Sequence, residues 1–357
     1  MQKNVNNSFI KKNRSMLIAL LLFILLPFIV GLFDGAGPLQ VWENGSGLSK
    51  FVQGLAIEIF ILALFALSYD LIFGFTGLLS FGHSMFFAVG AYLTGILLKN
   101  FDMSLGASFV ILMLASILQA LLFGLVLPRV KGITFALVTL GMASVFHVLV
   151  LSTEMQEYTG SDVGLQGVVV PSFLNPAAER LRLYFIALAI LAVAFMVFKR
   201  FVNSPTGRVC SAIRENEDRA LMLGYNTFYF KLAALMLSSF TAALAGMMHT
   251  IYQPIVSPHT ASLGFTVTAL LIILIGGVGT LSGALVGAVV YRLLDYGLRR
   301  YIGESASFIN GAIYVLIVLF LPYGIVGTWR LRSLQLSKGW HRLLGYFIKS
   351  GDKSETE

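Results

Sequence analysis

The feature that most constrains this chain is a series of apolar runs, most of them close to the length that crosses the hydrocarbon core of a bilayer. A membrane-spanning helix needs about 20 apolar residues, and only helices and closed barrels satisfy their backbone polar groups in lipid. The runs lack the strict alternation of barrel strands, so they predict helices. Ten runs stand out: Met16–Phe33, Phe51–Phe73, Leu79–Leu98, Ser104–Leu127, Ile133–Leu151, Leu183–Phe198, Leu232–Ile251, Leu263–Ile275, Leu281–Leu298 and Phe308–Leu321.

The composition agrees with a membrane location. Hydrophobic residues make up 57% of the chain and charged residues 12%, whereas a soluble domain carries about 25% charged residues. We therefore expect an all-α, polytopic transmembrane bundle of about 10 spans, within a range of about 8 to 11. The shortest run, Leu263–Ile275, predicts a half-helix or a re-entrant segment. Residues 16–325 are expected to form the transmembrane domain, between a basic N-terminus (1–15) and a basic C-terminal tail (326–357).

The two ends of the chain leave alternatives open. Lys11, Lys12 and Arg14 precede the first apolar run, as in a signal peptide, and Gly35-Ala36-Gly37 weakly resembles a cleavage site. More apolar runs follow, so we expect a retained first helix. The C-terminal tail is partly amphipathic, which predicts either a helix on the anionic inner surface of the membrane or a disordered segment.

The distribution of charge predicts the orientation. With a cytoplasmic N-terminus, 18 of the 25 Lys and Arg residues fall in cytoplasmic segments. Four acidic residues, Glu154, Glu157, Asp162 and Glu179, share one outer loop. The positive-inside rule then places both termini in the cytoplasm; the pair Arg299–Arg300, which lies outside in this topology, is its weakest point. The same rule explains the net charge of +8 without nucleic-acid binding.

Several kinds of site are absent from the sequence. The single cysteine, Cys210, excludes an internal disulfide framework. The five histidines have no ligand spacing that predicts a metal site. No Gly-x-x-x-x-Gly-Lys-Ser/Thr phosphate loop occurs, so the chain does not supply an ATP site of that form. No nucleophile–base constellation favours an intramembrane enzyme, so no catalytic residues are expected.

The hydrophilic segment 201–229 contains a predicted short helix. Asn216 is a good N-cap residue, and Glu217 and Asp218 occupy the first turn, where the helix dipole favours negative charge. The residues Ala220–Leu223 continue the helix, and Gly224 can adopt the left-handed conformation that ends it. Such a helix either rests on the lipid headgroups or docks into a groove on a cytoplasmic partner.

The same segment resembles a known family. Membrane subunits of ABC importers carry a coupling loop with an acidic-Ala-Ala, three residues, Gly pattern, and Asp218 to Gly224 keep this spacing with Arg219 in place of the first Ala. The longer string from Gly207 to Tyr225 is similar to the branched-chain amino acid permease family, LivM type. The resemblance implies a loop that couples to an ATPase through these residues: Arg208, Arg214, Glu215, Asn216, Glu217, Asp218, Arg219, Ala220, Leu223 and Gly224.

Three further motifs resemble this family. The stretch 69–92 is similar to the family and also to the related urea permeases. The stretch 275–283 is glycine-rich in the same manner. The predicted outer loop resembles the family's Thr-Gly-Gly-x-x-Gly-Leu, with Ser161 in place of the second Gly. The resemblance implies that this loop faces a binding protein through Thr159, Gly160, Ser161, Asp162 and Gly164.

Glycine has two uses in such motifs. Small residues let helix backbones approach closely in lipid, and glycine permits broken helices whose free backbone groups face a polar substrate. Two stretches, beginning at Gly74 and Gly276, share the pattern Gly-x-x-Gly-x-Leu-Ser. The shared pattern either marks equivalent positions in two halves of the chain or arises by chance. The candidate translocation pathway comprises Gly74, Thr76, Gly77, Ser80, Gly82, His83, Gly276, Gly277, Gly279 and Ser282.

Ionisable residues within or near the apolar runs indicate function by default, because charge in a membrane is costly. His83 lies within the first glycine motif, where it either acts on a substrate or serves as a hydrogen-bonded structural residue. Arg292 and Asp295 are three residues apart and can pair on one helix. The full set comprises Glu58, Asp70, His83, His147, His249, Arg292 and Asp295.

The resemblance implies a permease subunit of a bacterial ABC importer in the inner membrane that translocates Leu, Ile or Val. It also implies a homologous second permease subunit, two ATPase subunits that use ATP and Mg²⁺, and an extracytoplasmic substrate-binding protein. This chain itself is expected to bind no cofactor and no metal. Two alternatives remain: a permease for urea or a short amide, and an ion-coupled secondary transporter that depends on interior acidic groups.

Overall fold

The computed structural model describes residues 2–35, 37–43, 45 and 47–329. The predicted tail therefore lies outside the described residues from residue 330 onward. Helical elements, with short 3-10 and π segments written η, follow in this order: α1 (Gln2–Phe33), α2 (Pro38–Trp42), α3 (Leu48–Asp70), η1 (Leu71–Phe75), α4 (Ser84–Lys99), α5 (Leu105–Gly124), α6 (Ile133–Leu151), η2 (Thr153–Met155), α7 (Gln156–Thr159), η3 (Ser161–Val163), η4 (Ser172–Leu174), α8 (Arg180–Asn203), α9 (Pro205–Glu215), α10 (Glu217–Met222), α11 (Thr227–Tyr252), η5 (Pro258–Ala261), α12 (Leu263–Gly276), α13 (Ser282–Ile302), η6 (Gly303–Ser305) and α14 (Ala306–Phe320). The strands β1 (Leu165–Gln166) and β2 (Ile255–Val256) pair antiparallel.

Each of the ten predicted apolar runs overlaps a helix, so the all-α membrane bundle is confirmed; the run predicted from Leu79 begins too early, because α4 starts at Ser84. Among the described residues, six helices are long and apolar enough to cross a membrane, and three shorter apolar helices accompany them. The shorter ones are Ile18–Phe33 in α1, α4 and α12. The remaining predicted run forms α13, which carries four charged residues in its second half.

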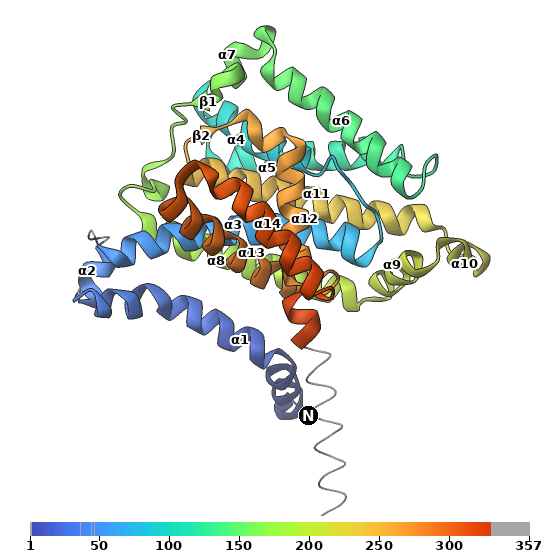
Figure 1. Ribbon diagram of the computed structural model, residues 1–357, viewed down its shortest axis with the longest axis horizontal. Helices are drawn as coiled ribbons and strands as arrows, with labels where there is room; N and C mark the ends of the chain where they lie inside the picture. The colour runs from blue at the N-terminus through green and yellow to red at the C-terminus, as the bar shows by residue number, and fades with distance from the viewer. Residues whose placement is uncertain (1, 36, 44, 46, 330–357) are drawn as a thin grey trace, which may run out of the picture.

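Helix α3 lies at the centre of the bundle. Of the apolar window in α3, 83% is buried, against 17% to 50% for the other five long candidates. Helices α1, α8, α11, α12 and α13 pack around it, and the arrangement is visible in Figure 1. This burial explains why the stretch 59–67 of α3 is apolar on every face, as an enclosed helix must be.

Helices α4 and α11 pack with their backbones in close contact. A Cβ on Gly90 would collide with the Ala243 backbone, and one on Gly246 would collide with the Phe87 carbonyl and the Ala91 amide. Both glycines therefore serve the close approach of helices that small residues permit in lipid.

Two short helices begin next to each other inside the bundle. The Ser84 backbone N–H at the start of α4 donates to Thr266 Oγ1 on α12 at 2.9 Å, and Ser84 Oγ donates to the Ala261 carbonyl at 3.3 Å. The 16 residues of α4 and the 14 of α12 extend about 24 and 21 Å, less than the hydrocarbon thickness of about 30 Å. The short run predicted at Leu263–Ile275 is thus a short helix that starts within the bundle.

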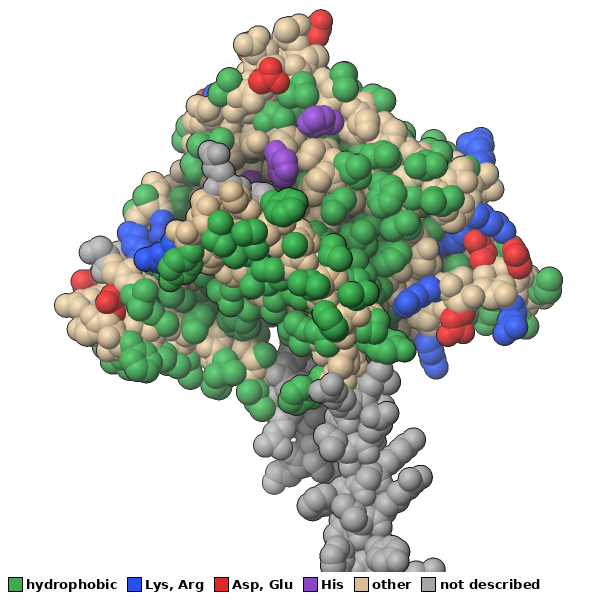
Figure 2. All heavy atoms as spheres, viewed as in Figure 1, with side chains coloured by type: hydrophobic (Ala, Val, Ile, Leu, Met, Phe, Trp, Pro, Cys, Tyr) green, Lys and Arg blue, Asp and Glu red, His purple; other side chains and the backbone are tan. Residues whose placement is uncertain are grey.

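The bundle has two polar ends and an apolar waist. Helix α2 lies at one end, and helices α9 and α10 lie at the other (Figure 1). Charged side chains gather at these ends, and hydrophobic side chains cover most of the surface between them in Figure 2. Exposed leucine, valine and phenylalanine residues on α5, α6 and α14 contribute to this surface, which suits contact with lipid.

Candidate functional site

Helices α9 and α10 form one pair at the polar end of the bundle. Ser204 caps α9 by accepting from the Gly207 amide at 3.2 Å, and Pro205 occupies its first turn. The single extended residue Asn216 ends α9 and caps α10, accepting from the Arg219 amide at 2.9 Å. The N-cap predicted from the sequence is therefore confirmed, while α9 adds a helix that the sequence analysis treated as part of a loop.

The end of α10 is a left-handed turn. Gly224 has φ +86°. The Tyr225 amide donates to the Ala220 carbonyl at 3.2 Å, and the Gly224 amide donates to the Leu221 carbonyl at 2.9 Å. These two bonds form a Schellman motif, which glycine accommodates without a Cβ penalty. The helix therefore ends where the sequence predicts.

The base of α10 is fixed to the start of α11. Glu217 Oε1 accepts from Lys231 Nζ at 2.5 Å and from Thr227 Oγ1 at 2.9 Å, and the Lys231 side chain is only 5% exposed. Asp218 accepts from Lys131 at 2.9 Å and raises the pKa of that ammonium group. Both members of this second pair are exposed, so it adds little stability; the buried pair at Glu217 holds the helix.

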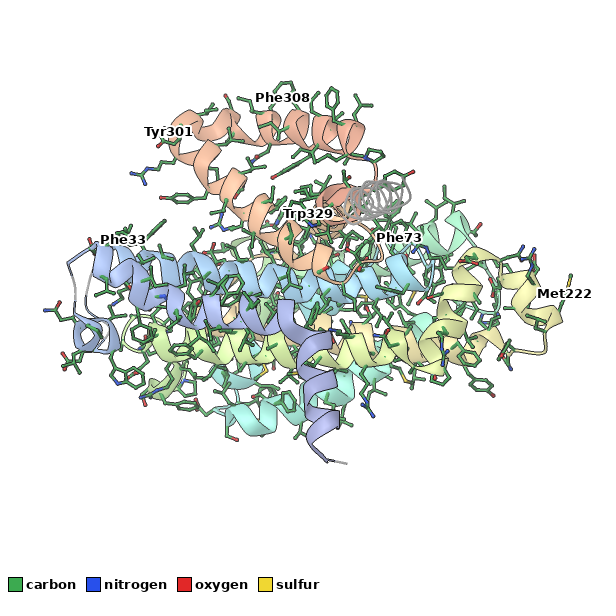
Figure 3. All side chains as sticks on the ribbon, turned by 90° about the horizontal axis from the view of Figure 1, so that it is seen from below. Phe33, Phe73, Met222, Tyr301, Phe308 and Trp329 are labelled. Carbon is green, nitrogen blue, oxygen red and sulfur yellow. The ribbon has the colours of Figure 1, made fainter. Side chains whose placement is uncertain are left out.

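The tip of the pair is apolar and exposed. Met222 and Leu223 are 86% and 72% exposed, and Leu221 and Tyr225 are each 45% exposed. Met222 points away from the bundle at the far end of the molecule in Figure 3. Exposed apolar patches rimmed by charge mark interaction sites. We call these four residues, Leu221, Met222, Leu223 and Tyr225, the α10 tip.

The inner face of α9 packs on the bundle through Gly207, Cys210 and Ile213, which recur every three residues. Cys210 Sγ lies 3.6 Å from the Phe230 carbonyl on α11. Burial raises the pKa of the Cys210 thiol to about 11.

This burial predicts slow thiol chemistry. The pKa of Cys210 rises from 9.0 to about 11, so its thiolate fraction at neutral pH falls about 100-fold. We expect maleimide to label the native protein at pH 7.4 at least about 100-fold more slowly than the detergent-denatured protein, measured by mass spectrometry. Equal rates in the two states would contradict the packing of α9.

Arg214 connects α9 to both glycine motifs. Its guanidinium donates to the Gly74 carbonyl at the end of η1. A Cβ on Gly77 would lie 3.1 Å from Arg214 Cγ, and a Cβ on Gly279 would lie 2.8 Å from Arg214 Nη1. The two Gly-x-x-Gly-x-Leu-Ser stretches, 202 positions apart in the chain, therefore meet around one side chain of the α9–α10 pair.

Asp70 holds the second glycine loop from the other side. Its side chain is fully buried. Oδ1 accepts from the Gly279 amide at 2.7 Å, and Oδ2 accepts from the Leu281 amide at 3.1 Å. Leu281 has φ +50° and ψ −54°, a sparsely populated backbone conformation that costs a non-glycine residue about 1–3 kcal/mol. The carboxylate thus stabilises a strained loop, and Arg214 supplies the opposite charge.

We call Asp70, Gly74, Arg214, Gly279 and Leu281 the glycine junction. Asp70 was predicted only as one of the ionisable residues near the apolar runs, without a partner in the loop at 279–281. The one signal available in the sequence was a carboxylate close to the end of an apolar run.

The predicted coupling residues all lie on or beside the α9–α10 pair. Arg208 and Glu215 are exposed on α9, and Ala220 is the buried residue of α10. The α10 tip therefore consists of the residues that follow Ala220, not of Ala220 itself.

The predicted pathway residues fall into two groups. Gly74, Gly77, Gly276, Gly277, Gly279 and Ser282 lie at or near the glycine junction. Thr76, Ser80, Gly82 and His83 belong to the loop between η1 and α4 and are nearly or fully buried. A solute would reach this second group only after helices move apart.

His83 sits in an aromatic environment. Its Nε2 is 2.8 Å from Ser68 Oγ, and its ring lies 5.0 to 5.4 Å from the rings of Phe65, Tyr69 and Phe86. Because Ser68 Oγ donates to the Phe65 carbonyl at 2.6 Å, the His83 Nε2–H donates to Ser68. This geometry favours the structural alternative for His83.

The predicted outer loop is a sequence of left-handed turns at the end opposite α10. Gly160 and Gly164 have φ values of +76° and +78°. Ser161, which replaces a glycine of the family pattern, keeps φ +48°, and its Oγ donates to the Leu151 carbonyl at 2.7 Å. Thr159 Oγ1 donates to the Val150 carbonyl at 2.7 Å, and Asp162 is exposed. The side-chain bond of Ser161 helps to stabilise a conformation that glycine adopts freely.

The sequence matches known proteins over most of its length. Residues 51–321 match the family model described as branched-chain amino acid transport system / permease component. The high-affinity branched-chain amino acid transport system permease protein LivM of Salmonella typhimurium is 25% identical over 82% of this chain and 73% of its own length. LivM of Escherichia coli is 24% identical over 94% of this chain and 79% of its own length.

The similarity extends to a second type of permease. The permease protein LivH of Salmonella typhimurium is 24% identical over 74% of this chain and 91% of its own length. No solved structure matches the chain at a significant level. Because the family model covers more than half of the sequence, the chain belongs to the branched-chain amino acid transport permease family.

Proposed function

We propose that this chain is a membrane-spanning permease subunit of an ABC importer that translocates Leu, Ile or Val by alternating access. Its relatives are named as permeases of branched-chain amino acid transport systems. The observation that carries the proposal is the α10 tip, an exposed apolar surface on a helix whose base is held rigidly. Such a surface suits a protein groove better than water.

The connection behind the tip supports a role in coupling. Because Asn216 joins α9 to α10, a displacement of α10 would also move α9. The Arg214 side chain of α9 donates a hydrogen bond to the Gly74 carbonyl. From there the contacts reach the loop that joins α12 to α13. Coupling between two sites requires an element with two states that both sites bias; we propose that the glycine junction is this element.

The assembly follows from the same proposal. The α10 tip faces one of two ATPase subunits, which bind ATP and Mg²⁺, while this chain binds neither. A homologous second permease completes the pore, and the loop at 159–164 faces an extracytoplasmic binding protein. The α10 end and both termini then lie in the cytoplasm, in keeping with the positive-inside rule, and about ten helices cross the bacterial inner membrane.

The contacts of the acidic residues favour an ATP-driven machine over an ion-coupled carrier. Both oxygens of Asp70 accept backbone amides. Glu58 pairs with Arg292, and Asp295 pairs with Arg292 and Arg299. A coupling carboxylate must release its proton or ion in each cycle, whereas these groups are committed to structural partners.

The test is purification from the native membrane in mild detergent, followed by reconstitution of the purified complex into liposomes. We expect an ATPase pair and a second permease to co-purify, and uptake of leucine delivered by the binding protein to require ATP. Leucine uptake by the chain alone, without ATP, would overturn the proposal. ATP-driven uptake of urea but not of leucine would keep the ATP-driven importer and replace its substrate.

A further inference from the structure

A cavity of about 910 Å³ lies at the end of the bundle opposite α10. Its walls come from the segment after β1, the start of α8, the end of α11, the segment around β2 and the first turn of α12. We propose that this cavity binds the transported solute, as a zwitterion with an apolar side chain, on its way into the pore. This inference rests on the proposed import function and adds the place and chemistry of a binding site.

One side of the cavity carries a positive charge. Arg180 lines it and donates through Nε to the Pro176 carbonyl at 3.1 Å and through Nη1 to the Lys50 carbonyl at 3.3 Å. A guanidinium has five N–H donors in a rigid fork. Two bonds therefore fix its position and leave further donors for a carboxylate, which arginine binds well.

Polar groups that accept or donate lie beside this charge. A Cβ added to Gly54 would lie 2.7 Å from the Tyr252 hydroxyl and 3.5 Å from Arg180 Nη1. The hydroxyl and the guanidinium therefore both lie next to Gly54. Gln253 also lines the cavity, and its Nε2 donates to Glu58 Oε1 at 3.3 Å. Glu58 itself is outside the lining and pairs with Arg292. The cavity wall thus offers the Arg180 cation for a carboxylate, and the oxygens of Tyr252 and Gln253 as acceptors for an ammonium group.

The rest of the lining is apolar or aromatic. Val168, Val170 and Ile255 line the cavity together with Phe265. The Phe265 ring lies 5.0 Å from the Phe65 ring and 4.7 Å from the Phe87 ring. Ligand sites combine apolar walls with a few fixed polar groups. These walls suit an aliphatic side chain, whereas urea has neither a side chain nor a charge to match.

The floor of the cavity is linked to the glycine junction. Phe265 is in the first turn of α12, and α12 ends at Gly276, three residues before Gly279 of the junction. A displacement of the junction would therefore shift α12 and the floor of the cavity together. The strand β2, which contributes Ile255 to the cavity wall, pairs with β1, and Gly164 packs against the Val256 carbonyl. The outer loop therefore contacts the cavity wall.

A cysteine-protection experiment tests the site in the purified complex. Ile255→Cys places a thiol on the cavity wall, at a side chain that is 52% exposed. Val169→Cys places one on a side chain that is 65% exposed and outside the lining, as the matched control. Buried Cys210 is expected to contribute little background labelling. The probes are L-leucine and urea, each added before maleimide.

We expect leucine at tenfold above its dissociation constant to slow labelling of Ile255→Cys about tenfold by mass action. Val169→Cys should label at an unchanged rate, and urea should protect neither. Adding Arg180→Gln should abolish the protection, whereas Arg182→Gln, on an exposed arginine of the same helix, should retain it. Both double variants should keep the labelling rate of Ile255→Cys without ligand, which shows that the cavity still folds.

Two results distinguish a failure of the proposed binding site from a failure of the proposed import function. If the complex imports leucine with ATP but leucine does not protect Ile255→Cys, the cavity is not the binding site and the import function stands. If leucine is neither imported nor protective, both proposals are wrong. Protection that persists in the Arg180→Gln variant would overturn the role of the guanidinium.

Discussion

Replacing Asp70 with alanine is expected to lower the free energy of unfolding by about 2–6 kcal/mol, because two backbone amides lose their acceptor at about 1–3 kcal/mol each. The variant leaves the amides of Gly279 and Leu281 without their acceptors. It also leaves Arg214 without the carboxylate that balances its charge. The strained φ of Leu281 then has no compensating bond. Thermal unfolding of the detergent-solubilised protein measures the change.

Further variants show which interaction of Asp70 causes the loss of stability. Asp70→Asn keeps one acceptor oxygen and should lose less stability than Asp70→Ala. Glu154→Ala removes an exposed carboxylate and should change stability by less than about 0.5 kcal/mol. Because Asp70 and Arg214 belong to one network, Asp70→Asn and Arg214→Gln together should cost less than the sum of their separate effects. Unfolding of Asp70→Ala at the wild-type temperature would contradict the role of the junction.

Much of the fold follows from local signals in the sequence. Ile133–Leu151 is predicted and found with identical bounds, because Gly132 and Ser152 stop the run on both sides. The predicted start of the third span at Leu79 is too early, since α4 begins at Ser84. Gly77 has φ +76°, and the loop after it returns into the bundle before the helix begins. Hydrophobicity alone does not distinguish such a buried loop from a helix.

The glycine junction was less accessible to sequence reasoning. The helix signals at Asn216 and Gly224 are local and therefore readable. The bonds from Asp70 to residues 209 and 211 positions away leave no local signature. Helix α9 was missed because Gly207 lies in its first turn, where its lack of a Cβ serves packing against the Val202 backbone. The cavity residues Arg180 and Gln253 lie outside every recognised motif.

The second large effect is expected at the α10 tip. Met222→Asp should uncouple ATP hydrolysis from uptake, because it places a charge where an apolar side chain is proposed to enter a groove of the ATPase. Truncating such an anchor residue costs about 2 kcal/mol or more, which corresponds to about a 30-fold loss of partner affinity. Uptake of leucine into proteoliposomes should fall at least about tenfold.

The structure decides which substitution tests docking. Ala220→Asp places a charge at a buried position, so it would disturb α10 itself. Met222 is 86% exposed, and its variant should unfold at the wild-type temperature. Leu125→Asn, at a residue that is 61% exposed at the end of α5 and outside the α9–α10 pair, is the control and should transport normally. Wild-type uptake by Met222→Asp would show that the tip only rests on the membrane surface. Retained stability with lost coupling would require a protein partner at the tip.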